Sequence, residues 1–162
     1  MISKYTRVPY GLSVHGKDEI NAVIKVLKNS TQMGSNVRSF EQKISKLFNK
    51  KYGLMVNSGS SAIMLAIESL NLPPNSEIIT PALTFSTTVS YLIKNNLKPV
   101  FVDVKKNTYC VDPLDILKKI NTKTRAIIAP HLMGNLVDWK IIKKGIKGKK
   151  IFLIEDSADT IG

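Results

Sequence analysis

The sequence contains one cysteine and two histidines among its 162 residues. Cys110 therefore has no partner for an internal disulfide, and so few sulfur and imidazole ligands argue against a zinc site. No run reaches the roughly 18 apolar residues of a membrane span, and the first residues have no apolar segment typical of a signal peptide. We therefore expect a protein of a reducing cytoplasm, with no membrane contact and no bound metal.

Familiar catalytic and nucleotide-binding motifs are also missing. The sequence has neither the Gly-x-x-x-x-Gly-Lys-Ser/Thr loop of P-loop NTPases nor the Gly-x-Gly-x-x-Gly turn of dinucleotide-binding folds. Serines are frequent, but none stands in the Gly-x-Ser-x-Gly elbow of the α/β hydrolases. These absences argue against a function in any of the three classes.

Acidic residues are scarce: 12 of them stand against 24 lysines and arginines, which leaves a net charge of +12. Such a charge can mark a nucleic-acid binder. Here, however, lysines recur along the whole chain on predicted polar helix faces, and aromatic residues are not interleaved with them. We therefore expect no nucleic-acid partner, whereas a general attraction for small phosphorylated molecules fits the charge.

Short apolar segments alternate with amphipathic ones through most of the sequence. Apolar runs predict strands at 52–56, 77–80, 99–104, 125–129 and 151–155. Helical spacing and caps predict helices at 18–29, 37–48, 62–70 and 84–95, after Asp112, and at 138–146. This alternation is typical of a three-layer α/β fold, with a mostly parallel sheet covered by helices on both faces. Residues 1–16 are predicted to be an N-terminal arm.

The stretch 54–62 ends an apolar run in small polar residues and leads into a helix. Free N–H groups at a helix N-terminus and the positive end of the helix dipole attract anions. Gly59 lets the backbone turn and approach a ligand closely. One interpretation is that Gly59, Ser60 and Ser61 bind a phosphate, and the alternative is a serine-rich N-cap without a ligand.

Ligands of parallel sheets lie beyond the carboxyl ends of the strands, so the polar residues there are the candidates for chemistry. Asp156 follows an apolar run, and it either holds the protonated ring nitrogen of a cofactor or caps a following helix. Phe85 either stacks on a flat ligand or belongs to the core. His131 either donates to a cofactor or substrate oxygen or is a structural histidine.

Several segments, in their order and spacing, resemble the N-terminal half of sugar-modifying enzymes of the DegT/DnrJ/EryC1/StrS family. They are residues 33–41, 56–62, 81–88, 100–104, 131–135 and 154–158. The resemblance implies the type I aminotransferase fold with pyridoxal 5'-phosphate (PLP), or its amino form pyridoxamine 5'-phosphate (PMP), as cofactor. It also implies that residues 17–162 are a truncated, N-terminal part of the PLP-binding large domain.

The same resemblance assigns roles to individual residues. Residues 59–61 would hold the cofactor phosphate, Phe85 would stack on the pyridine ring, and Asp156 would pair with the ring nitrogen. Asp159 would face the ring hydroxyl, and His131 would contact the substrate. This interpretation requires that Ser60 and Asp156 lie on one side of the sheet, within reach of a single cofactor molecule.

The resemblance leaves three functions open. The first is an aminotransferase that places nitrogen from a donor such as glutamate on a keto sugar nucleotide, for surface polysaccharide or lipopolysaccharide. The second is a PMP-dependent 3-dehydrase of a CDP-4-keto-6-deoxyhexose, which would need an iron–sulfur reductase; the acid at Asp159 favours this branch. The third is a non-catalytic, truncated remnant that associates with a second polypeptide.

The resemblance also bears on activity and assembly. In the family, the lysine that forms the Schiff base, or the histidine that replaces it in the dehydrases, lies downstream of the segments found here. No catalytic residue is therefore predicted in this chain, and the chain is expected to be inactive alone. Type I enzymes build each active site from two subunits, so a homodimer is expected of the complete protein.

Overall fold

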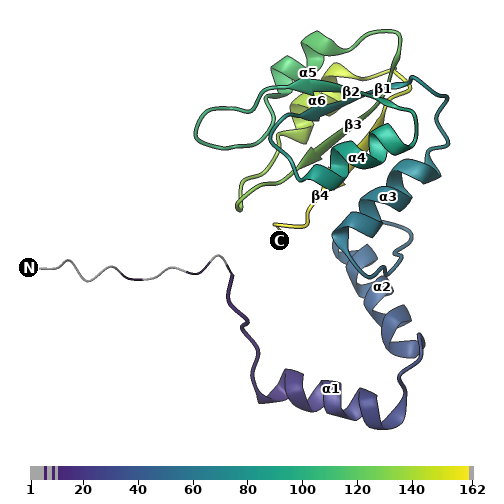
Figure 1. The fold of residues 1–162 in the computed structure, drawn as a ribbon, viewed down its shortest axis with the longest axis vertical. Coiled ribbons are helices and arrows are strands. Elements are labelled where there is room, and N and C mark those ends of the chain that lie inside the picture. The colour runs from purple at the N-terminus through teal and green to yellow at the C-terminus, as the bar shows by residue number, and fades with distance from the viewer. Residues whose placement is uncertain (1–5, 7–8, 10, 161–162) are drawn as a thin grey trace, which may run out of the picture. The chain divides into compact units, whose positions relative to one another are not determined.

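The structure is a computed structural model that describes residue 6, residue 9 and residues 11–160 (Figure 1). The chain divides into two compact units, Met1–Met55 and Val56–Gly162. Most of the predicted arm, residues 1–16, lies outside the described residues, so its boundary stays a prediction. Within the described part, no helix combines the length and apolar character that crossing a membrane requires.

The first unit contains two helices, α1 (Lys17–Asn29) and α2 (Ser35–Leu47), which confirms the two helices predicted there. The N-terminus of α1 is stabilised by Glu19, whose carboxylate accepts the Gly16 N–H at 2.7 Å. In α2, the Glu41 carboxylate accepts the Met55 N–H at 2.7 Å and so ties the end of this unit back to the helix.

The predicted strand at 52–56 is wrong. The segment is irregular, and its apolar side chains Tyr52 and Leu54 are 77% and 73% exposed. An apolar run predicts burial, but a strand also needs a neighbour for its backbone hydrogen bonds. No strand among the described residues pairs with this segment, and the Met55 N–H bonds to a side chain instead.

The second unit contains a parallel four-stranded sheet of order β2-β1-β3-β4. Its strands are β1 (Glu77–Pro81), β2 (Lys98–Val102), β3 (Thr124–Pro130) and β4 (Phe152–Asp156). All three neighbouring pairs run parallel, as predicted, and four of the five predicted strands are confirmed with small shifts at their ends. The central strands β1 and β3 are almost wholly buried, which explains the apolar residues 78–79 and 126–130 in them.

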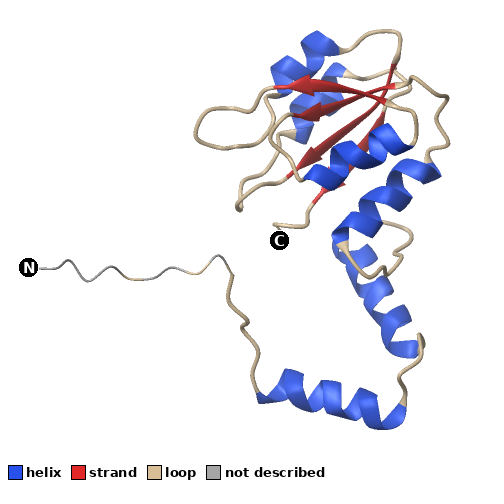
Figure 2. Cartoon of the chain, viewed as in Figure 1, coloured by secondary structure: helices blue, strands red, loops and turns tan. Residues whose placement is uncertain are grey.

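Helices cover both faces of this sheet, so the predicted three-layer α/β fold is confirmed (Figure 2). One face packs against α3 (Gly59–Ser69) and α4 (Ser86–Lys94), and the other against α5 (Pro113–Lys119) and α6 (Trp139–Gly145). Side chains alternate along each strand, so Ile78 belongs to the α3/α4 core and Ile79 to the α5/α6 core. Asp112 caps α5 as predicted.

Candidate functional site

All four strands of the sheet end at the same edge, because they run parallel. The turns that follow β1, β3 and β4 therefore meet there; they contain the predicted site residues Phe85, His131 and Asp159, and Asp156 is the last residue of β4. The N-termini of α4 and α6, which follow β1 and β3, face the same edge. The structure thus collects residues from segments that are far apart in the sequence at one end of the second unit.

Alternation along β4 places Asp156 on the face that α3 and α4 cover. Leu153 packs against the α5/α6 core and Ile154 against the α3/α4 core. Two residues further on, Glu155 and Asp156 repeat this alternation. The N-terminus of α3 lies at the same place: a Cβ atom added to Gly59 would lie 3.6 Å from the Cβ atom of Ala158, two residues after Asp156.

The N-terminus of α3 combines a cap with free donors. Ser58 is the N-cap, and its hydroxyl oxygen accepts the Ser61 N–H at 3.1 Å. The Ser61 hydroxyl donates to Asn57 Oδ1 at 2.6 Å. The N–H groups of Gly59 and Ser60 have no hydrogen-bond partner among the described residues. The serine-rich cap is therefore present, and two donors remain available to an anion.

The N-terminus of α4 lies beside that of α3. The Ser60 hydroxyl donates to Thr87 Oγ1 at 3.2 Å and joins the two first turns. Phe85, the N-cap residue of α4, is 66% exposed. Its ring is not part of the core, which was the alternative left open by the sequence, and it is free to contact a flat ligand.

Asp156 keeps part of its hydrogen-bonding capacity unused. Its carboxylate is half-buried, and Oδ1 accepts the Ala158 N–H at 3.1 Å. Residues 157–160 form no helix, so the alternative of a helix N-cap is not what the structure contains. Within the described residues, Oδ2 has no partner, and the exposed Asp159 makes no side-chain hydrogen bond. Both acids can therefore accept a ligand.

His131 lies in a different environment from the other candidates. Its side chain is 3% exposed and meets Trp139 edge-on, at 6.5 Å between ring centroids, on the α5/α6 face. Nδ1 accepts the Val137 N–H at 2.9 Å, and Nε2 lies 2.6 Å from Glu155 Oε1. Both ring nitrogens are therefore used inside the protein, as in the structural alternative; contact with a substrate stays a prediction.

Sequence reasoning missed Glu155. The signal that could have found it is register: Ala129 pairs with Glu155 and Pro130 with Asp156, so the residue after β3 adjoins both acids. No cluster of three or more potential metal ligands occurs in the part of the chain that the structure describes. The chemistry available at this edge is thus anion binding at α3, an exposed aromatic ring and free carboxylates.

Comparisons with known proteins match this chain along most of its length. Residues 14–162 match the sequence model of the DegT/DnrJ/EryC1/StrS aminotransferase family. A dTDP-4-dehydro-2,6-dideoxy-D-glucose 3-dehydratase of Saccharopolyspora spinosa is 36% identical over 162 residues, which cover 95% of this chain and 35% of that protein. A 3-oxo-glucose-6-phosphate:glutamate aminotransferase of Bacillus subtilis is 32% identical over 147 residues, covering 90% of this chain and 33% of that protein.

A solved structure has the same architecture. The GDP-4-keto-6-deoxy-D-mannose-3-dehydratase of E. coli with bound hydrated PLP superposes with a TM-score of 0.90 at 34% identity. The match covers 96% of this chain and 42% of the dehydratase chain. In all three comparisons, the present chain thus spans well under half of the related protein.

Proposed function

This chain belongs to the DegT/DnrJ/EryC1/StrS aminotransferase family, and on that premise we propose that it forms the cofactor-phosphate and ring-nitrogen site of a PLP-dependent enzyme acting on a keto sugar nucleotide. One observation carries the proposal. The free N–H groups of Gly59 and Ser60 and the part-free carboxylate of Asp156 lie on the same sheet face, at the same edge. The related E. coli dehydratase was solved with PLP.

Each end of the proposed site suits one end of the cofactor. The α3 N-terminus offers N–H donors, the Ser60 hydroxyl and the positive end of a helix dipole to a phosphate. Ser61 would donate its hydroxyl proton, which bonds to Asn57 Oδ1 in the free protein, since its N–H is occupied by Ser58. Asp156 would hold a proton on the ring nitrogen, and Phe85 would lie against the ring. When bound, such a cofactor supplies an electron sink.

Two reactions remain in the proposal. Transfer of an amino group from a donor such as glutamate to a keto sugar nucleotide is supported by the aminotransferase relative. Removal of a hydroxyl group by the PMP form, as in a 3-dehydrase, is supported by the two dehydratases and by the exposed acid at Asp159. We keep both, because the residue that separates them lies outside the segments matched here.

We also propose that the 162-residue chain does not turn over substrate by itself. None of its lysines lies in a segment that resembles the family's Schiff-base motif, and the reaction needs such a base to move the proton. A cytoplasmic location and a homodimer of the complete protein belong to the same proposal. Glutamate incubated with the chain and PLP should give no 2-oxoglutarate, and turnover would contradict this point.

A binding titration with PMP tests the site itself. PMP carries the ring and the phosphate but no aldehyde, so it forms no Schiff bases with the many surface lysines. We expect saturable binding, followed by PMP fluorescence, and much weaker binding of pyridoxamine, which lacks the phosphate. Equal binding of the two compounds, or no saturable binding, would overturn the proposal; the second result would favour the non-catalytic alternative.

A further inference from the structure

We propose that His131 and Glu155 form a positioning pair that fixes Asp156 from the opposite face of the sheet, and that His131 does not contact the substrate. The inference rests on the proposed function of Asp156 as the ring-nitrogen carboxylate. It assigns roles to two residues, one buried and one exposed, that the proposed site does not itself use. The contacts that support it lie around the carboxyl ends of β3 and β4.

The hydrogen bonds of the His131 ring define its tautomer. Nδ1 accepts the N–H of Val137 at 2.9 Å, so this nitrogen carries no proton. The proton of the neutral ring therefore lies on Nε2, which donates to Glu155 Oε1 at 2.6 Å. A bond this short with an ionised acceptor belongs to the stronger class of protein hydrogen bonds.

The backbone of His131 binds the neighbouring residue of β4. Its N–H donates to the Asp156 carbonyl oxygen at 2.9 Å. His131, the residue after β3, thus forms two hydrogen bonds with β4: one from its ring to the Glu155 side chain and one from its N–H to the Asp156 backbone. Asp156 is the last residue of β4, which has only β3 as its neighbour in the sheet, so the bond from His131 restrains Asp156 on that side.

The turn that carries Asp159 is fastened to the same residue. The Thr160 hydroxyl donates to the His131 carbonyl oxygen at 3.3 Å and accepts the Gly134 N–H at 3.1 Å. His131 is therefore the point at which the turns after β3 and β4 are joined. Asp156 and Asp159, the two acids predicted to face the cofactor, lie four residues and one residue before Thr160.

The pair has the burial expected of a positioning device. The His131 side chain is 3% exposed, whereas that of Glu155 is 47% exposed, so the imidazole is the fixed member and the carboxylate closes onto it. Without this bond, Glu155 and Asp156 themselves would be joined to the turn after β3 only by the backbone bond from the His131 N–H. A binding carboxylate displaced by a fraction of an ångström loses affinity for a rigid ring held at its other end.

The ring of His131 can be observed directly by nitrogen NMR. The chain has two histidines, and His15 is exposed, so it serves as an internal control. We expect His131 to show the neutral tautomer with the proton on Nε2 and His15 to show an averaged mixture. We expect Glu155→Ala to change the His131 signals and Glu155→Gln, whose amide oxygen still accepts, to preserve the tautomer. A His131 ring averaged like His15 would overturn the pair.

The affinity for PMP tests whether the pair positions Asp156. We expect Glu155→Ala to weaken PMP binding roughly tenfold, and Glu155→Gln to restore it to within about twofold of the wild type. Asp115→Ala removes an equal charge from a surface ion pair and should leave the affinity unchanged. Unchanged binding by Glu155→Ala, or no recovery in Glu155→Gln, would overturn the positioning role.

The two readouts separate this inference from the function on which it rests. If the wild-type chain binds no PMP, the proposed function fails, whereas the NMR measurement still decides whether the pair exists. If the wild type binds PMP and the tautomer is as expected, the affinity of Glu155→Ala decides the positioning role alone.

Discussion

Two carboxylates at opposite edges of the same sheet differ in their hydrogen-bond partners: one is held inside the protein, and the other is the one that we propose binds the cofactor. Glu77 is the first residue of β1, at the amino edge, and Asp156 is the last residue of β4, at the carboxyl edge. Their positions follow from the parallel topology, in which every strand begins at one edge of the sheet and ends at the other. They differ in what surrounds them.

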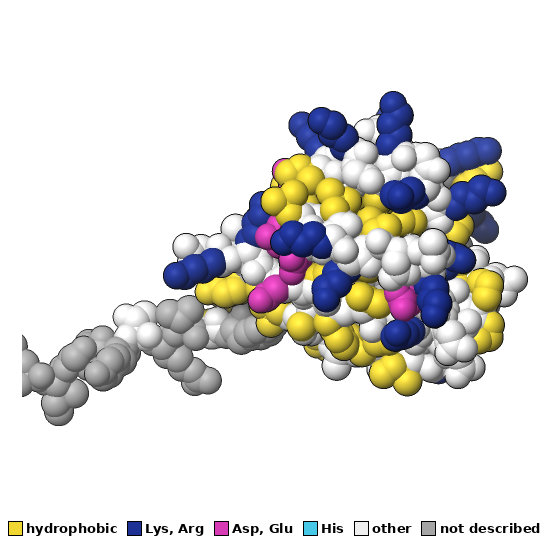
Figure 3. Space-filling model, turned by 90° about the horizontal axis from the view of Figure 1, so that it is seen from above, with side chains coloured by type: hydrophobic (Ala, Val, Ile, Leu, Met, Phe, Trp, Pro, Cys, Tyr) yellow, Lys and Arg dark blue, Asp and Glu magenta, His cyan; other side chains and the backbone are white. Residues whose placement is uncertain are grey.

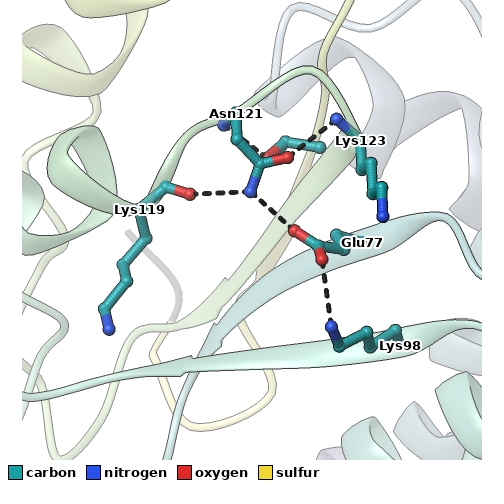
Figure 4. A network of polar contacts seen from close by, with 6 residues as sticks. Glu77, Lys98, Lys119, Asn121 and Lys123 are labelled. Carbon is teal, nitrogen blue, oxygen red and sulfur yellow. Dashed lines mark hydrogen bonds and ion pairs between the residues drawn. The ribbon is translucent and has the colours of Figure 1, made fainter.

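Glu77 is fully engaged inside the protein (Figure 4). One carboxylate oxygen accepts from Asn121 Nδ2 at 2.7 Å, and the other from Lys98 Nζ at 3.2 Å. Asn121 is itself held, since its Oδ1 accepts the Lys123 N–H at 2.7 Å. The hydrogen bond from Asn121, assisted by the charge of Lys98, lowers the pKa of Glu77 below its ordinary value of 4.5. Asp156, by contrast, has a single backbone donor.

The charged residues of the helices are also divided between the two edges of the sheet. Helices that return from the carboxyl edge carry lysines in their last turns, as in Lys94 of α4 and Lys118 of α5, whereas Asp112 and Asp138 cap the starts of α5 and α6. Figure 3 shows lysine and arginine side chains projecting around one face of the molecule, with the acidic ones gathered mainly at one side. The comparison teaches that hydrogen-bond partners, not residue type, distinguish the structural carboxylate of Glu77 from that of Asp156, which we propose binds the cofactor.

The largest expected effect is that of Asp156→Asn on PMP affinity. The amide oxygen can still accept the Ala158 N–H, so the turn should survive, but the negative charge beside the ring nitrogen is lost. We expect a loss of about 2 kcal/mol, or roughly thirtyfold in affinity, with little change in thermal stability. If Asp156→Asn lost as much free energy of unfolding as it lost in PMP binding, Asp156 would have a structural role like that of Glu77, and the comparison would fail.

The converse change is Glu77→Ala. It removes the acceptor of Asn121 and Lys98 at a site where the Glu77 side chain is 9% exposed, and it leaves Asn121 Nδ2 with only its longer bond to the Lys119 carbonyl oxygen, at 3.4 Å. We expect the free energy of unfolding to fall by about 1–2 kcal/mol, measured by urea denaturation, with PMP affinity unchanged. A variant of normal stability and weakened PMP binding would contradict the assignment.

Ser60→Ala should produce a smaller loss at the carboxyl edge. Its hydroxyl, which donates to Thr87 in the free protein, is expected to turn to the phosphate. We expect a loss of about 1 kcal/mol, or roughly fivefold, in PMP affinity. Ser69→Ala, at the other end of α3, removes a hydroxyl that donates only to the Ala66 carbonyl oxygen, and it should bind PMP like the wild type. Equal effects of both serines would exclude a site at the α3 N-terminus.

The smallest expected effect is on the pH dependence of stability. Because the pKa of Glu77 is lower in the folded protein, its contribution is present above the unfolded value of 4.5 and is lost as the pH falls through the folded value. Glu77→Gln should therefore flatten this acidic part of the stability profile, by less than about 1 kcal/mol. Identical profiles for Glu77→Gln and the wild type below neutral pH would show that Glu77 is not stabilised by its partners.

Most of the fold could be predicted from the sequence, because each strand contains a short apolar run and the strands alternate with amphipathic helices. The failure at 52–56 arises from the same rule, since an apolar run does not reveal whether a pairing strand exists. The contact of Glu77 with Asn121, 44 residues away, and that of His131 with Glu155 depend on strand register. Sequence periodicity places residues on a face, but it does not align one strand with another.

The sequence predicts that the candidate site lies at the carboxyl edge of the sheet, and it predicts the residues there. It does not predict the contacts between them. The cap at Ser58 and the exposure of Phe85 depend on how α3 and α4 begin, which differs by a few residues from the predicted helices. The occupied ring of His131 could not be inferred from a loop sequence, since its partners come from Val137 and from another strand.

A crystal structure of this chain with PMP tests the central claim most directly. We predict the phosphate at the N–H groups of Gly59 and Ser60, the ring nitrogen at the Asp156 carboxylate, and the ring beside Phe85. PMP bound on the α5/α6 face, or among the lysines at the amino edge, would contradict the account. So would a phosphate at α3 with a ring that does not reach Asp156.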